Sequence, residues 1–337
     1  MPIRVAINGF GRIGRAFFKQ AFERPEIELV AVNDLGSCEN LAYLLRFDSV
    51  YGRYEREVAV EGGAFVVGGK RIQALAVKDP VALPWKDLAI DVVVESTGLF
   101  THSDKAKLHL EAGAKRVVIS APAKGEVLTV LVGINEDKFA GNALTCNASC
   151  TTNAASPVAA IMMETVGVKK AILNTVHAYT ASQNLVDGPV KDDDFLRGRA
   201  AAVNIVPSST GAAEAVAKAL TDLDKLFTGI SMRVPVVAGS IADFTFLANR
   251  ATTVEEVNDI LRKAAREPRW QNIFTVSEQS LVSTDIIKNP YASIADLPMT
   301  RVVDGDLIKI LAWYDNEWGY TTTLVEHVIR AAKSPTN

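Results

Sequence analysis

The stretch N-G-F-G-R-I-G at residues 8–14 constrains the fold of this chain more than any other part of its sequence. It follows a short β-branched run and opens a helical pattern. In such a turn, the first glycine allows a tight bend and the second lets the backbone approach a pyrophosphate. The third lets the helix pack closely on the sheet, while the helix N-terminus faces the anion. Gly9, Gly11 and Gly14 therefore predict a dinucleotide-binding βαβ unit.

An acidic residue stands where such a unit needs one. Asp34 follows Gly14 by twenty residues, at the end of the second strand pattern. A carboxylate at this place binds the ribose 2′-hydroxyl of the dinucleotide. Its charge should repel a 2′-phosphate, so we expect the cofactor to be NAD and not NADP.

The first part of the chain alternates strand and helix patterns, which predicts a parallel sheet with helices on its faces. The strand patterns lie at 3–7, 27–32, 91–95 and 116–120, and the helix patterns at 15–24 and 104–113. A glycine-rich insertion at 48–77 predicts small antiparallel strands.

The pattern changes after residue 150. A helical run at 154–165, a strand at 171–180 and an irregular segment at 181–207 come first. Further strands are expected at 229–235, 241–248 and 307–314, and further helices at 211–220 and 253–266.

A chain of 337 residues suggests about two domains. We expect a Rossmann-type doubly wound parallel sheet for NAD binding at 1–149. An α+β catalytic domain with a mostly antiparallel sheet should follow at 150–315. A C-terminal helix within 316–337 should pack back on the first domain.

Composition excludes several other classes. The net charge of −3 gives no electrostatic reason to bind nucleic acid or an anionic membrane. No apolar run approaches the ~20 residues of a membrane span, and the first strand pattern leaves no room for a signal peptide. The three cysteines, Cys38, Cys146 and Cys150, are odd in number and widely spread, which is typical of free thiols in a reducing compartment. We expect a soluble cytoplasmic protein without a metal site.

Cys150 is the candidate nucleophile. Its neighbours in N-A-S-C-T-T-N are small and polar, whereas a buried structural cysteine usually has apolar ones. A thiol needs help to ionise at neutral pH, and the N-terminus of the following helix favours an anion. His177, on the next strand, could pair with the thiol or accept its proton, although the sequence leaves open whether they touch. The other histidines, His102, His109 and His327, are expected to be structural.

Five motifs then follow one another in the order found in one enzyme family: S-C-T-T-N at 149–153, H-A-Y-T at 177–180, A-A-A-V-N-I-V-P-S-S-T-G-A-A at 200–213, R-V-P at 233–235 and W-Y-D-N-E-W-G-Y at 313–320. Through them the chain resembles the phosphorylating, NAD-dependent glyceraldehyde-3-phosphate dehydrogenases from residue 3 to its final helix. The resemblance implies that Cys150 attacks the aldehyde of D-glyceraldehyde 3-phosphate and forms a hemithioacetal. His177 would activate the thiol and remove the hydroxyl proton as hydride leaves for NAD. Inorganic phosphate would then attack the thioester and release 1,3-bisphosphoglycerate, a reaction of glycolysis and gluconeogenesis.

The resemblance also implies two anion sites and a cofactor site. The substrate phosphate would contact Thr180, Ser182 and Arg233. The attacking phosphate would contact Ser149, Thr151, Arg199, Thr210 and Gly211. The cofactor would contact Gly9, Phe10, Gly11, Arg12, Ile13, Gly14, Asp34, Thr97, Ser120, Pro189, Asn316 and Tyr320. Among these, Asn316 would hold the nicotinamide carboxamide, and Pro189 of a neighbouring subunit would crowd the adenosine ribose, in a homotetramer.

Three positions depart from the commonest family pattern. Ala154 replaces a second cysteine, which removes one route to an intramolecular disulfide. Leu196 replaces an arginine, with Arg197 shifted by one place, and this bears on the phosphate site and the subunit contacts. Ala238 stands where an asparagine is usual, so a packing effect at the interface is expected.

Two other functions fit parts of the same pattern. An erythrose-4-phosphate dehydrogenase would use the same nucleophile and let water resolve the acyl enzyme. A non-catalytic NAD-binding or nucleic-acid-binding protein could use the same scaffold. Thr180 and the intact S-S-T-G favour the phosphorylating enzyme over the first, and the Cys150–His177 set favours an enzyme over the second.

Overall fold

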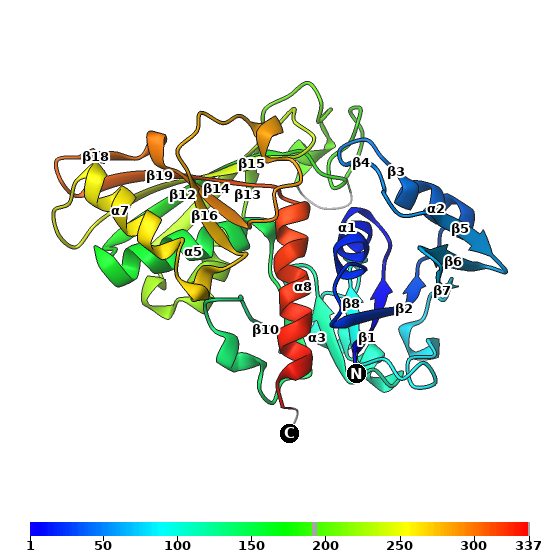
Figure 1. The fold of residues 1–337 in the computed structure, drawn as a ribbon. Helices are drawn as coiled ribbons and strands as arrows, with labels where there is room; N and C mark the ends of the chain where they lie inside the picture. The colour runs from blue at the N-terminus through cyan, green and yellow to red at the C-terminus, as the bar shows by residue number, and fades with distance from the viewer. Residues whose placement is uncertain (191–193, 336–337) are drawn as a thin grey trace. The chain divides into compact units, whose positions relative to one another are not determined.

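A computed structural model describes residues 1–190 and 194–335 of the chain (Figure 1). It divides into two compact units. Unit 1 comprises Met1–Ala148 with Thr321–Asn337, and unit 2 comprises Ser149–Tyr320. The sequence analysis placed the corresponding boundaries after residues 149 and 315.

Unit 1 is built on a nine-stranded sheet of order β10-β11-β9-β8-β1-β2-β7-β6-β5. The seven strands from β10 to β7 are parallel to their neighbours, and β6 and β5 extend the sheet antiparallel. The strands are β1 (Ile3–Asn8), β2 (Ile27–Asn33), β5 (Val58–Glu61), β6 (Ala64–Val67), β7 (Lys70–Leu75), β8 (Val92–Glu95), β9 (Arg116–Ile119), β10 (Leu128–Thr129) and β11 (Leu144–Cys146). The insertion predicted to be antiparallel supplies β5 and β6 and a small hairpin of β3 (Phe47–Asp48) and β4 (Gly52–Arg53).

Short helices connect these strands. They are α1 (Arg12–Ala21), α2 (Cys38–Arg46), α3 (Ser103–Ala106) and α4 (Leu108–Glu111), with 3-10 turns η1 (Pro80–Ala82) and η2 (Glu136–Phe139). The sequence did not predict α2. The single helix expected at 104–113 is instead α3 and α4, which meet at Lys107.

The last helix, α8 (Trp318–Lys333), contributes most of its length to unit 1. Its side chains bond to α1, to the turn after α1 and to the end of β11, through Gln20–Thr321, Arg24–Glu326, Thr145–His327 and Asn147–Thr323. The C-terminal helix is therefore held on the unit that carries the glycine turn.

Unit 2 is built on a sheet of order β13-β14-β12-β15-β19-β17-β16, with β18 beside β19. Only β12–β14 and β16–β17 are parallel pairs. The strands are β12 (Lys170–Ala178), β13 (Val206–Ser209), β14 (Phe227–Val234), β15 (Ser240–Leu247), β16 (Phe274–Ser277), β17 (Ser293–Asp296), β18 (Arg301–Val303) and β19 (Leu307–Tyr314). The predicted fold class, a Rossmann-type unit followed by an α+β unit with a mostly antiparallel sheet, is confirmed.

Helices cover one face of this second sheet. They are α5 (Cys150–Thr165), α6 (Ala212–Ala219) and α7 (Val254–Ala264), and they pack on β15, β17 and β19, on β14 and on β16 respectively. Along β15 and β19, buried residues alternate with half-exposed ones, as expected for a sheet packed on one side only. Five 3-10 turns complete the unit: η3 (Phe195–Gly198), η4 (Thr221–Leu223), η5 (Pro268–Trp270), η6 (Ser283–Ile286) and η7 (Leu297–Met299).

Within the described residues, no helix is long and apolar enough to cross a membrane.

His327 of α8 is a buried polar group at the attachment of this helix. Its Nε2 lies 2.8 Å from Thr145 Oγ1 of β11, and its ring packs edge-on against Phe139 at a centroid distance of 4.7 Å. Burial lowers the pKa of His327 to about 3. The ring is therefore neutral in the folded protein at pH values where a histidine in an unfolded chain takes up a proton.

This difference predicts how stability responds to acid. Below about pH 6.5 the unfolded chain binds a proton at His327 that the folded chain does not, so the free energy of unfolding falls as the pH drops. In His327→Phe that contribution is absent, and from pH 6.5 to 5.0 the free energy of unfolding should fall by about 2 kcal/mol less than in the wild type. Urea unfolding at both pH values measures it. His102→Gln, at a half-exposed histidine, is the control, and an unchanged pH response in His327→Phe would contradict the assignment.

Candidate active site

The glycine turn of unit 1 has the close approaches that its sequence pattern requires. Gly9 adopts a φ of 95°, and a Cβ there would lie 2.6 Å from the backbone nitrogen of Thr97. A Cβ on Gly14 would lie 2.1 Å from the carbonyl oxygen of Gly9, so only glycine lets α1 start this close to β1. At Gly11 a Cβ would meet nothing within 4 Å. The second glycine thus faces open space, where a ligand can approach the backbone.

The start of α1 suits an anion. Gly11 is its N-cap, and among the described residues no side chain caps this helix end. Backbone N–H groups of a first turn without a side-chain cap attract phosphate oxygens. The Arg12 guanidinium is bonded to Asp48 at 2.7 Å, so we expect the backbone at Arg12 and Ile13, and not the arginine charge, to contact a pyrophosphate.

Asp34 is fixed just past the end of β2. Its Oδ2 accepts a hydrogen bond from the Phe10 N–H at 2.7 Å, and its Oδ1 accepts one from the Gly36 N–H at 2.9 Å. Each carboxylate oxygen has a second lone pair, so both can still accept a ribose hydroxyl. The open turn, the helix end and this carboxylate fit an NAD molecule.

A buried network that the sequence analysis missed fixes Thr97. Glu95 Oε1 accepts hydrogen bonds from the Thr97 N–H at 2.8 Å and from its hydroxyl at 2.5 Å. Glu95 Oε2 faces Asn8 Nδ2 at 2.6 Å and His109 Nε2 at 3.1 Å. The Trp85 indole N–H donates to His109 Nδ1 at 3.0 Å, so the proton of a neutral His109 lies on Nε2. The signal for this network in the sequence was Glu95, a charged residue at the end of the valine-rich strand pattern at 91–95.

The other predicted cofactor residues lie in both units. In unit 1, the backbone N–H of Ser120 donates to the Glu95 carbonyl at 2.9 Å. In unit 2, Asn316 Oδ1 accepts a hydrogen bond from the Ser240 hydroxyl at 2.9 Å, and Tyr320 is buried. The carbonyl of Pro189 accepts a hydrogen bond from Asn184 at 3.3 Å.

Cys150 is the first residue of α5. The preceding residue, Ser149, is the N-cap, and its Oγ accepts a hydrogen bond from the Thr152 N–H at 3.1 Å. Ala148 enters this turn with a φ of 53°, a left-handed conformation that costs a non-glycine residue about 1 kcal/mol. The thiol therefore stands at the positive end of a 16-residue helix, where a negative charge is favoured.

His177 reaches Cys150 from the neighbouring strand. It lies near the end of β12, and the distance from Cys150 Sγ to His177 Nε2 is 3.3 Å. On the other side of the ring, Arg233 Nη1 lies 2.8 Å from His177 Nδ1. The parallel pairing of β12 with β14 places His177 directly opposite Arg233. The contact that the sequence left open is present.

Two further side chains enclose this pair. The hydroxyl of Tyr314, at the end of β19, lies 2.9 Å from Thr151 Oγ1. Its ring meets the His177 ring edge-on, with centroids 5.9 Å apart. The sequence analysis did not single out Tyr314, whose position follows from the β15–β19 register.

Burial dominates the protonation of the pair. It lowers the pKa of His177 to about 3, and the nearby positive charge of Arg233 acts in the same direction. Burial raises the pKa of the Cys150 thiol, although the Arg233 charge and hydrogen bonds at Thr151 oppose it. Burial therefore disfavours a charge on either group, while the helix N-terminus favours a thiolate. The site can hold a nucleophile and a base.

The residues predicted for the substrate phosphate lie beside the pair. Thr180 Oγ1 and Ser182 Oγ are 2.9 Å apart. Arg197 donates to Ser182 Oγ at 2.8 Å and to Ser208 Oγ at 3.1 Å. We call Thr180, Ser182, Arg197 and Ser208 the hydroxyl–arginine cluster. Arg197, noted in the sequence only as a shifted arginine, is thus the charged member of this cluster.

The residues predicted for the attacking phosphate are less closely gathered. Thr210 Oγ1 accepts a hydrogen bond from the Ala212 N–H at 3.2 Å, and Gly211 is the N-cap of α6. Arg199 is exposed and pairs with Asp187 at 3.0 Å. In this structure Arg199 is therefore bound to a carboxylate.

The three departures from the family pattern have different surroundings. Ala154 is fully buried in α5, Ala238 is buried before β15, and Leu196 is exposed on η3. The two alanines are thus core residues, whereas Leu196 adds to an exposed apolar surface.

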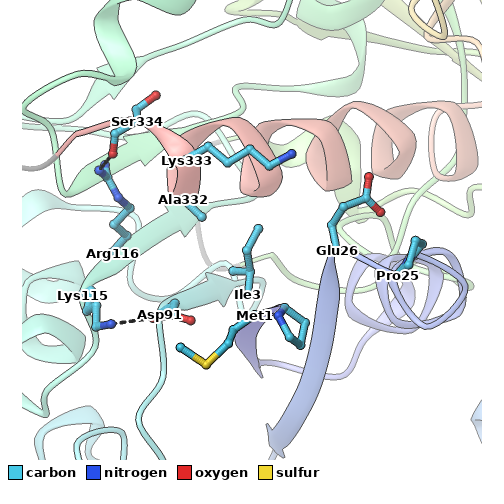
Figure 2. Close-up of a pocket in the computed structure, with 11 residues that line it drawn as sticks. Met1, Ile3, Pro25, Glu26, Asp91, Lys115, Arg116, Ala332, Lys333 and Ser334 are labelled. Carbon is cyan, nitrogen blue, oxygen red and sulfur yellow. Dashed lines mark hydrogen bonds and ion pairs between the residues drawn. The ribbon is translucent and has the colours of Figure 1, made fainter.

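A hollow of about 660 Å³ in unit 1 lies away from these groups (Figure 2). It is lined by Ile3 at the start of β1 and by Arg116 at the start of β9, together with the ion pair Lys115–Asp91. Parallel α/β sheets bind ligands at the opposite, carboxyl ends of their strands. This hollow is therefore not the dinucleotide site. Separately, no group of three or more His, Cys, Asp or Glu side chains within the described residues is arranged to hold a metal ion.

Comparison with known proteins finds the same family in both units. Residues 3–103 match the NAD binding domain of glyceraldehyde 3-phosphate dehydrogenase, and residues 149–316 match its C-terminal domain. The chain is 47% identical to glyceraldehyde-3-phosphate dehydrogenase from Mycobacterium tuberculosis over 342 residues, covering 99% of this chain and 100% of the relative. It is 46% identical to glyceraldehyde-3-phosphate dehydrogenase 1 from Streptomyces avermitilis over 329 residues, covering 97% of both. This chain belongs to the glyceraldehyde 3-phosphate dehydrogenase family.

Proposed function

We propose that this protein oxidises D-glyceraldehyde 3-phosphate with NAD and inorganic phosphate to 1,3-bisphosphoglycerate. The observation that carries the proposal is the Cys150–His177 pair, with 3.3 Å between Sγ and Nε2 at the start of α5. A thiol beside a base at a helix N-terminus is the arrangement of an activated cysteine nucleophile. This reaction is a step of glycolysis and, in reverse, of gluconeogenesis.

Cys150 forms the covalent intermediate. The thiol proton first passes to His177 Nε2; the sulfur then attacks the aldehyde carbon, and Nε2 returns the proton to the former carbonyl oxygen, which becomes the hydroxyl of the hemithioacetal. The helix N-terminus stabilises the thiolate that exists between these steps. Substrate phosphate is held by Thr180, Ser182 and Arg233, whose hydroxyls and guanidinium supply charge-assisted hydrogen bonds.

The cofactor is held mainly by unit 1. The glycine turn and the start of α1 bind the pyrophosphate, Asp34 binds the adenosine ribose, and Thr97 is fixed by Glu95 for a further contact. Bound NAD supplies the hydride acceptor. Asn316, fixed by the Ser240 hydroxyl, holds the carboxamide and so selects a face of the nicotinamide.

His177 serves again as a base. It removes the hydroxyl proton of the hemithioacetal when this is oxidised to the thioester on Cys150. Inorganic phosphate, bound by Ser149, Thr151, Thr210 and Gly211 with Arg199, then displaces the thiolate. A site that excludes water protects the thioester from hydrolysis, so the free energy of the oxidation is kept in the acyl phosphate.

The active protein is a homotetramer in the cytoplasm. Large apolar side chains are strongly exposed in the irregular segment after β12, at Leu185, Val186, Phe195, Val203 and Ile205. The sheet face of unit 2 that its helices leave uncovered also exposes apolar residues. Exposed apolar patches mark surfaces that contact other proteins, and we assign these to the subunit contacts. Cys38, Cys146 and Cys150 are all free thiols, as in a reducing compartment.

Phosphate dependence is the direct test of the reaction. Purified protein with NAD and glyceraldehyde 3-phosphate should form NADH continuously only when inorganic phosphate is present, because phosphate resolves the thioester. Absorbance of the reduced cofactor measures it. Equal turnover without phosphate would contradict the proposal and favour hydrolysis, with erythrose 4-phosphate as the next substrate to assay.

The nucleophile has a matched control within the chain. Cys38 is also the first residue of a helix, and Ser37 caps that helix as Ser149 caps α5, but its thiol lies near the acid Glu39, whereas the Cys150 thiol faces His177. Cys150→Ser should lower kcat at least about 1,000-fold, because an alcohol is a far weaker nucleophile at neutral pH. Cys38→Ser should retain turnover. Comparable losses in both variants would show that the cysteines act through stability and not through catalysis.

A further inference from the structure

A row of buried polar side chains crosses the carboxyl edge of the sheet of unit 1. Strand pairing sets Asn33, Asn8 and Glu95 side by side, as the last residues of β2, β1 and β8. The chain continues from β2 to β7 and then returns to β8, so the strand order reverses between β1 and β8. Dinucleotides bind in the crevice outside such a reversal. The row therefore lies at the part of the edge where the cofactor is expected.

Hydrogen-bond directions along this row are fixed from one end by the backbone. The Val77 N–H donates to Asn33 Oδ1 at 2.8 Å, and Asn33 Nδ2 donates to the Val77 carbonyl at 2.9 Å and to Asn8 Oδ1 at 2.7 Å. With its oxygen engaged in this way, Asn8 turns its amide nitrogen to Glu95 Oε2, at 2.6 Å. A backbone N–H can only donate, so neither amide can be reversed.

An indole fixes the directions from the other end. The Trp85 N–H can only donate, and it donates to His109 Nδ1 at 3.0 Å. The proton of a neutral His109 then lies on Nε2, which donates to Glu95 Oε2 at 3.1 Å. Glu95 Oε1 accepts from the Thr97 N–H at 2.8 Å and from the Thr97 hydroxyl at 2.5 Å. All of these partners donate, and the short contact from the hydroxyl is typical of an O–H bonded to an ionised carboxylate.

Glu95 is thus a buried anion held by hydrogen bonds alone. It is 1% exposed, and within residues 1–190 and 194–335 no lysine or arginine pairs with it. A buried carboxylate without a cation beside it must be surrounded by hydrogen-bond donors. The hydrogen of the Thr97 hydroxyl is one of the donors that meet this requirement, so it is not available to a ligand.

The Thr97 hydroxyl can therefore only accept from a ligand. Thr97 is half-buried next to the glycine turn, where a Cβ on Gly9 would lie 2.6 Å from its backbone nitrogen. Its hydrogen goes to Glu95, and one of its two lone pairs accepts the Leu99 N–H at 3.0 Å. The other lone pair can accept from a hydroxyl or an amino group. A phosphate oxygen also only accepts, so it cannot bond to this hydroxyl.

We propose that Glu95 makes the Thr97 hydroxyl an acceptor that recognises a neutral hydrogen-bond donor of the cofactor, a ribose hydroxyl or an amino group, and not its phosphates. Glu95 is then a positioning residue that acts on the cofactor through Thr97. This deepens the proposed function and rests on it for NAD as the ligand. The pyrophosphate is left to the start of α1, where among the described residues no side chain occupies the backbone N–H groups of the first turn.

A protonated Glu95 would give the opposite polarity. A carboxylic acid with its hydrogen on Oε1 would donate to Thr97 Oγ1, and the Thr97 hydroxyl would then be free to donate outward. A phosphate oxygen of the cofactor would be a suitable partner for it. The two accounts differ in which group of NAD the hydroxyl of Thr97 contacts, so analogues of NAD separate them.

The first test combines Thr97→Val with analogues that each lack one donor of NAD: the adenine amino group, a single ribose hydroxyl or the carboxamide nitrogen. Calorimetry measures the dissociation constants. Thr97→Val should bind NAD about fivefold more weakly than the wild type, as for one lost hydrogen bond, and this factor should vanish for one analogue. Thr101→Val, at a half-buried threonine nearby, is the control and should bind as the wild type. Equal weakening for NAD and every analogue, or none for NAD, would overturn the proposal.

The second test changes the carboxylate. Glu95→Gln places an amide nitrogen among groups that all donate, so NAD should bind at least about tenfold more weakly. Adding Thr97→Val should then weaken binding by less than about twofold, because the polarity of the hydroxyl is already lost. Glu111→Gln, at an exposed glutamate of the same unit, is the matched control. A further fivefold loss on adding Thr97→Val would mean that Thr97 acts independently of Glu95, against the proposal.

The third test uses the wild-type protein, so it does not depend on Glu95→Gln folding well. Nitrogen-15 resonances of labelled histidine show which ring nitrogen of His109 carries the proton, with His109→Gln identifying the signal. Nε2 should be protonated and Nδ1 unprotonated. An unprotonated Nε2 would require a hydrogen on Glu95 Oε2 and would contradict the anion. Protein that behaves as expected here but does not reduce NAD with glyceraldehyde 3-phosphate would refute the proposed function alone, since none of these measurements requires turnover.

Discussion

The contact between Cys150 and His177 depends on where three elements of unit 2 begin and end. The helix α5 starts at Cys150 itself, because Ser149 provides the N-cap. The strand β12 lies between β14 and β15; its pairing with β14 includes His177 itself, and its pairing with β15 reaches the preceding residue, Val176. The same pairing with β14 sets Arg233 opposite His177. Thiol, imidazole and guanidinium are therefore ordered by backbone register, which is far stiffer than their side chains.

The charges of Cys150, His177 and Arg233 are coupled, because the three side chains lie next to one another. All three groups are desolvated, and desolvation disfavours a charge on each of them. The helix N-terminus favours a thiolate, whereas the guanidinium beside Nδ1 disfavours an imidazolium.

The sequence predicts best what local geometry decides. The glycine turn, the alternation of strands and helices in unit 1 and the start of α5 beside a polar segment are all readable from neighbouring residues. The Glu95 network could not be predicted, because it joins Asn8, Thr97 and His109 through the side-by-side order of β1 and β8. Arg197 was underrated for the same reason, since its two serine partners lie eleven and fifteen residues away. The Arg233–His177 contact spans 56 residues and exists only through strand register.

A single-turnover experiment tests the central claim, that oxidation leaves an acyl group on Cys150. The protein is mixed with NAD and glyceraldehyde 3-phosphate in phosphate-free buffer, quenched in acid and examined by intact mass and peptide mapping. The account predicts a burst of about one NADH per chain and a phosphoglyceryl thioester on the peptide that contains Cys150, which disappears on adding inorganic phosphate. NADH formation without any adduct on that peptide would contradict it.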